Sequence, residues 1–264
     1  MKSISPPKGS PLDRTVSFVR ITGALPIAIA SIVAVAMLAA RIAYAHRITY
    51  VFLAWNLFLA WIPFVLSLPF DRARDAPAIT DASSPSPTHR ERDRDRTPLR
   101  RIALALLALA WLAFLPNAPY LVTDFVHLHG RPGVPIAYDA TMLFAFAVAG
   151  FLSMSASLRA VQSAVARRLG DRLGWSFAIS VLSLSGVGVY VGRVLRWNSW
   201  DVVARPDELA RITWSAALDP VGHARALVLS AACAIVSLAA YSVTRAWLAE
   251  VSLDAAGARA HDDG

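Results

Sequence analysis

The chain has 264 residues, of which 56% are hydrophobic, and its mean hydropathy is +0.49. This composition excludes an ordinary soluble domain and predicts an integral membrane protein. The net charge of +8 comes mostly from arginines that flank apolar segments, so we interpret it as setting orientation in a membrane and predict no nucleic-acid partner.

The first third of the chain contains two apolar runs and two polar segments. Residues 1–20 form a polar, basic tail, and residues 21–70 hold spans at 21–40 and 48–70. Each run is long enough to cross a hydrocarbon core of about 30 Å as a helix. Residues 71–101 contain Ser-Pro repeats and alternating Arg and acidic residues, with no apolar surface to bury. They predict a disordered linker on the cytoplasmic side.

The third span begins at Ile102 and meets Pro116 after fourteen apolar residues. That length is about 21 Å as a helix, which is too short to cross the membrane. The helix is therefore expected to continue, kinked, through Pro116 and Pro119. Each proline leaves a carbonyl one turn back without its usual donor, and such a group needs a partner inside a membrane.

Residues 102–248 complete the predicted bundle, with further spans at 134–158, 173–195 and 224–248, and a polar tail follows at 249–264. Gly188 and Gly192 form a small-xxx-small spacing that lets helices of one bundle approach closely. The polar connection between spans five and six contains Pro206-Asp207-Glu208, a sequence typical of a helix start. The fold predicted is an all-α, polytopic membrane helix bundle with six transmembrane helices.

The distribution of basic residues predicts the orientation. Of the 26 Lys and Arg residues, 18 fall in the two tails and in the even-numbered connections, and 8 fall on the other side. The positive-inside rule then places both termini in the cytoplasm.

Polar residues on four predicted spans lie at one depth near the outer end: Asn56, Asn117, Asp139 and Arg193. Polar groups in a membrane mark either a functional site or contacts that lock helices together. The full candidate site also includes residues of the flanking motifs. Its members are Asn56, Asn117, Tyr120, Asp124, His127, Tyr138, Asp139, Arg193, Arg196, Asn198, Trp200 and Asp201.

The motifs that follow spans three and five are expected to meet on the outer face, because both spans run outward. One motif carries Asp124 and the other carries Arg193 and Arg196. A buried aspartate without a cation costs several kcal/mol, which favours pairing across the two motifs. We expect Asp124 to pair with Arg193 or Arg196, with Asp139 as a second acceptor.

These motifs resemble an uncharacterised bacterial membrane protein family, domain of unknown function 1361. The resemblance rests on residues 115–128, on Tyr138-Asp139 and on residues 196–202, and it covers about residues 48–248. It implies a multi-pass protein of the bacterial plasma (inner) membrane, and it implies no established activity. The long linker at 71–101 departs from the family pattern.

Three kinds of function fit these residues. In the first, Arg193 and Arg196 bind a polar or anionic small molecule or a lipid headgroup, since guanidinium suits phosphate and carboxylate. In the second, the protein is a membrane enzyme acting on an envelope lipid or glycan, with an acid or base drawn from Asp124, His127, Asp139 and Asp201. In the third, it is a structural membrane subunit without a ligand.

No metal and no cofactor are predicted. Asp124 and His127 share a helical face, whereas His127 and His129 share one only in an extended chain, so no regular structure directs all three at one ion. The lipid bilayer is the predicted partner, and the sequence leaves the oligomeric state and the choice between enzyme and binding protein open.

Overall fold

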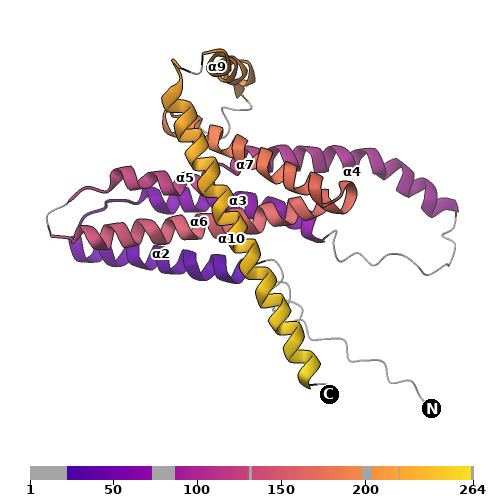
Figure 1. The fold of residues 1–264 in the computed structure, drawn as a ribbon, viewed down its shortest axis with the longest axis horizontal. Helices are drawn as coiled ribbons and strands as arrows, with labels where there is room; N and C mark the ends of the chain where they lie inside the picture. Colours follow the sequence, from indigo (N-terminus) through magenta and orange to yellow (C-terminus); the bar gives the residue numbers. More distant parts are fainter. Residues whose placement is uncertain (1–22, 73–86, 131–132, 198–203, 220, 263–264) are drawn as a thin grey trace.

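The fold is known from a computed structural model that describes residues 23–72, 87–130, 133–197, 204–219 and 221–262. The described residues are organised as helices (Figure 1), as predicted. Six helices are long and apolar enough to cross a membrane, which confirms the predicted number of spans. These spans are α2 (Ala24–Ala45), α3 (Phe52–Arg72), α4 (Pro87–Phe114) with its continuation, α6 (Ile136–Leu169), α7 (Asp171–Arg193) and α10 (Ala224–Asp262).

Helix α6 is the centre of the bundle. It packs against α2, α3, α7 and α10 and against α5 (Asn117–Thr123), and its apolar stretch is 67% buried, compared with 22–44% for the other five spans. Small residues allow this crowding. A Cβ atom added at Gly150 would lie 2.6 Å from the carbonyl oxygen of Ala118, so α5 can approach α6 only because glycine is present.

Span three is interrupted at Pro116, where the prolines predict a kink, and it continues beyond this point, as its length predicts. Helix α4 ends at Phe114, and the path continues through α5 and the 3-10 helix η1 (Asp124–His127). The carbonyl of Leu115 accepts a hydrogen bond from the Ala118 amide at 3.2 Å, and the side chain of Asn117 donates to the Phe114 carbonyl at 2.9 Å. The Leu115 carbonyl, which Pro119 leaves without its usual helical donor, and the neighbouring Phe114 carbonyl therefore both have donors at the break.

The glycine spacing in α7 fits against this break. A Cβ at Gly188 would lie 2.5 Å from Cγ of Pro116, whereas a Cβ at Gly192 would meet nothing nearer than 3.6 Å. Gly188 therefore sets the distance between α7 and the Pro116 turn. The predicted use of this motif for packing within the bundle is correct at Gly188.

Several helices are longer than the sequence indicates. Helix α6 continues to Leu169, beyond the predicted end of its span at 158. Helix α4 begins at Pro87, inside the predicted disordered linker at 71–101, and α10 continues to Asp262, beyond the predicted end of span six at 248. Residues 73–86 lie outside the described residues. Extending a helix adds one hydrogen bond per residue without a new nucleus, so a stable span can carry polar residues as added helical turns.

The two ends of the bundle are named here by the residues they carry. We call the end that carries residues 46–51, 124–130 and 193–197 the motif end, and the end that carries Gly170 the opposite end. Helix α9 (Pro206–Leu218) starts with proline and two acidic residues, as predicted, and stands apart from the bundle (Figure 1).

Candidate functional site

Asp124 is the centre of the polar layer at the motif end. It begins η1 directly after the broken span and is fully buried. Its two carboxylate oxygens accept hydrogen bonds from Nδ2 of Asn56 at 3.0 Å and from Nη1 of Arg193 at 3.2 Å. One carboxylate therefore connects α3, η1 and α7, and the predicted pairing of the two motifs is present.

Arg193 is the last residue of α7 and makes further contacts with α5. Its Nη1 also donates to the Tyr120 hydroxyl at 3.0 Å, and its Nη2 donates to the Thr123 carbonyl at 3.0 Å. The guanidinium carbon lies 5.2 Å from the centre of the Tyr120 ring. A cation at the carboxyl end of α5 is favourable, because the last carbonyls of a helix carry partial negative charge. These contacts fix the guanidinium in one orientation.

A second ion pair joins α2 to α6. Asp139 accepts from Nε of Arg41 at 2.6 Å and from Nη2 at 3.0 Å, and the two side chains are 2% and 1% exposed. Arg41 also donates to the Thr49 hydroxyl and lies 4.6 Å from the centre of the Tyr50 ring. This two-bond geometry is the strong form of an arginine–carboxylate contact.

The expected role of Asp139 as a second acceptor beside Asp124 is therefore wrong. Asp139 lies on the side of α6 that packs against α2, and the fully buried Arg41 occupies both of its oxygens. The Asp139 side chain is 1% exposed and is enclosed in its contact with α2, away from the Asp124 pair.

Aromatic side chains connect the two ion pairs. The hydroxyl of Tyr50 donates to the carbonyl of His127 at 2.8 Å, and the rings of Phe52 and His127 meet edge to face at 5.0 Å. The hydroxyl of Tyr138 donates to the Met37 carbonyl at 2.8 Å, which again ties α6 to α2. Two predicted residues, His127 and Tyr138, thus contribute to contacts between segments.

Other predicted residues have different positions. Asn117 donates to a carbonyl of its own broken span, and Arg196 is an exposed residue with a positive φ of 60° just after α7. The predicted members Asn198, Trp200 and Asp201 lie outside the described residues. Within the described ranges, no group of three or more His, Cys, Asp or Glu residues is placed to hold a metal ion.

Sequence reasoning missed Arg41, which it counted only as a charge that sets orientation. Arg41 follows the buried residues Ala34 and Leu38 at spacings of seven and three, so all three share one helical face. An arginine in register with the buried face of a span was the signal that it pairs inside the bundle.

Six apolar helices, with α6 at the centre of the bundle, define a multi-pass integral membrane protein. The family described as "Protein of unknown function (DUF1361)" matches residues 55–239, well over half of the chain, and the chain belongs to this family. The matched region includes Asp124, Asp139 and Arg193, and it begins after Arg41. No curated protein and no solved structure matches the chain.

Proposed function

We propose that the motif end binds an anionic group, carried by a lipid headgroup or a polar small molecule, through Arg193 and Arg196. The observation that supports this most is the difference between the two ion pairs. The side chain of Arg193 remains 18% exposed although three partners hold it, whereas Arg41 is 2% exposed. A guanidinium that is fixed and still reachable needs little reorganisation to accept an anion.

Arg196 supports the same proposal. It is exposed and lies three residues after Arg193, just beyond the carboxyl end of α7. A guanidinium presents donors in a planar fork that fits phosphate and carboxylate. Two arginines at one end of the bundle, at the depth of the headgroups, make a positively charged surface for an anionic ligand.

The enzyme alternative has less support from the described residues. Asp124 and Asp139 are completely buried and each is paired with an arginine, so neither reaches a substrate as an acid or base. The third alternative, a structural role without a ligand, is favoured only for the Arg41–Asp139 ion pair. Arg41 and Asp139 form a closed contact that fastens α2 to α6.

We further propose that the protein lies in a bacterial plasma membrane with both termini in the cytoplasm, so the motif end faces outward. The 18-to-8 distribution of basic residues supports the orientation. The resemblance of the motifs supports the bacterial location.

The binding proposal is tested with the full-length protein in nanodiscs that contain phosphatidylglycerol carrying a photoreactive headgroup. Labelled peptides are mapped by mass spectrometry. We expect labelling at residues 190–197, and we expect Arg196→Gln to reduce it about tenfold because a charge-assisted contact is lost. The matched control is Arg47→Gln, which removes an exposed positive charge near the same end.

Two results would contradict this proposal. One is labelling at 190–197 that falls equally in Arg196→Gln and Arg47→Gln, because general surface charge would then explain it. The other is the absence of labelling at residues 190–197. Inorganic phosphate and citrate are added as soluble anions to parallel samples: labelling that they suppress indicates a site for a soluble anion, and labelling that they leave unchanged indicates a lipid headgroup.

A further inference from the structure

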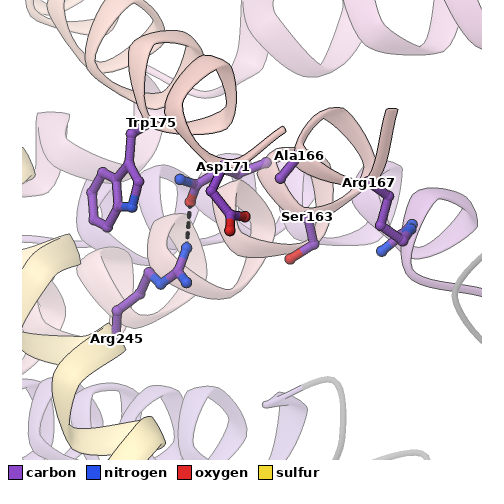
Figure 2. A pocket seen from close by; sticks show the side chains of 7 residues that line it. Ser163, Ala166, Arg167, Asp171, Trp175 and Arg245 are labelled. Atoms are coloured by element: carbon purple, nitrogen blue, oxygen red, sulfur yellow. Dashed lines mark hydrogen bonds between the residues drawn. The ribbon is translucent and has the colours of Figure 1, made fainter. Parts of the chain in front are cut away.

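A cavity of about 470 Å³ lies at the opposite end of the bundle, between α6, α7 and α10 (Figure 2). Its walls carry polar side chains from each of these helices. Those that matter here are Gln162, Ser163, Arg167, Asp171, Trp175 and Arg245. None of them belongs to the motif-end site.

The depth of the cavity follows from the length of α6. Asp139 and Gln162 are twenty-three residues apart on this helix, which is about 34 Å at a rise of 1.5 Å per residue. A hydrocarbon core is about 30 Å thick. If Asp139 lies at one headgroup level, Gln162 and the cavity beside it lie at the other.

One wall of the cavity is held by a buried amide. Gln162 is 2% exposed, and its Oε1 accepts hydrogen bonds from the Tyr241 hydroxyl and from Nη1 of Arg245, the latter at 2.8 Å. Arg245 also lies over the Trp175 ring, 5.2 Å from its centre. Two contacts thus fix this guanidinium at the cavity, and an arginine fixed in advance loses less freedom when it binds.

The facing wall carries a second arginine. Arg167 is exposed and donates one long hydrogen bond, of 3.4 Å, to the Phe70 carbonyl, and a guanidinium has five N–H donors, so further donors remain for a ligand. Figure 2 shows Ser163 and Asp171 between Arg167 and Arg245. The cavity therefore offers two cations and a hydroxyl to an anion, and one carboxylate to a neighbouring donor.

This combination fits a phosphodiester headgroup better than a simple anion. The arginines and Ser163 suit the phosphate oxygens, and Asp171 suits a hydroxyl or ammonium group attached to the phosphate. Apolar side chains for acyl chains are close by in sequence. Ile179 lies one turn further along α7 and is 47% exposed.

We propose that this cavity binds the phosphodiester headgroup of a phospholipid in the leaflet at the opposite end of the bundle. Basic pockets between transmembrane helices are a recurrent site for anionic headgroups. The proposal is independent of the motif-end site, because it uses different residues at the other end of the bundle, with α7 contributing its first turns here and its last residue there.

The test is native mass spectrometry of the full-length protein released from detergent with added phosphatidylglycerol. We compare Arg167→Gln/Arg245→Gln with the matched control Arg168→Gln/Arg172→Gln, which removes two exposed charges from the same end but outside the cavity. We expect the cavity variant to bind the lipid at least about tenfold more weakly, and the control to stay within about twofold of the original protein.

Arg245→Lys distinguishes loss of binding from misfolding, because it keeps the positive charge and a long side chain and loses only the planar fork. We expect it to restore part of the affinity. Parallel samples receive inorganic phosphate alone. Lipid binding that phosphate does not displace supports a headgroup site, and displacement by phosphate at similar concentrations would overturn the lipid assignment.

Equal losses in the cavity variant and in the control would also overturn the proposal, since charge at this end would then be sufficient. The labelling experiment at residues 190–197 tests the motif-end site and does not test this cavity. If the motif-end site fails its test, lipid binding at the cavity is still decided by the Arg167 and Arg245 variants.

Discussion

At the scale of single residues, the two ion pairs differ in how much they contribute to stability. Arg41→Met leaves the fully buried Asp139 without its cation, so we expect a loss of about 3–5 kcal/mol in the free energy of unfolding. The double variant Arg41→Met/Asp139→Leu is expected to recover most of this loss, because no unpaired charge remains. Reversible unfolding in mixed micelles of sodium dodecyl sulfate and a neutral detergent measures both.

At the Asp124–Arg193 pair, we compare the free energy of unfolding of Asp124→Asn with that of Arg193→Ala. The amide oxygen can still accept one of these two hydrogen bonds, from Asn56 or from Arg193, whereas loss of the arginine leaves a buried carboxylate without its cation and the Thr123 carbonyl without this donor. We expect Arg193→Ala to be the more destabilising of the two. Equal effects would show that the carboxylate charge is not important for stability.

The sequence predicted one ion pair correctly and missed the other. Asp124 and Arg193 follow spans that run in the same direction, so the order of the spans is enough to bring them together. Arg41 and Asp139 are 98 residues apart, and their meeting depends on which face of α6 receives α2. That choice is made by packing over the whole bundle, which no local pattern reports.

At the scale of helices, the approach of α7 to the Pro116 turn gives a sharp test. Gly188→Ala places a Cβ 2.5 Å from a proline ring, which cannot turn away, so we expect a loss of about 1–3 kcal/mol. Gly192→Ala is the matched control, because its nearest neighbour would be 3.6 Å away. Unfolding in the same mixed micelles measures the difference, and equal stability of the two variants would contradict this packing.

Helix positions were predictable where length or composition limited the choice. A run of fourteen apolar residues before Pro116 had to continue to cross a membrane, and the structure has α5 and η1 in that place. The helix starting at Pro87 was not predictable in the same way. The composition of residues 71–101 shows that this segment has no apolar surface to bury. It does not show whether the helix of the next span extends back into the segment.

At the scale of the whole molecule, the orientation in the membrane decides which leaflet each site faces. We expect reporter fusions placed after Arg94 and after Glu208 to lie in the cytoplasm and on the outer side, respectively, because the basic residues are distributed 18 to 8. Green fluorescent protein reports the first location and alkaline phosphatase the second. A third fusion after Gly170 should behave like the first, since α6 and α7 separate it from the motif end. Reporters found on the same side after Arg94 and Glu208 would contradict the six-span arrangement. If both reporters instead lie on the sides opposite to those expected, the two proposed sites exchange leaflets and their chemistry is unchanged.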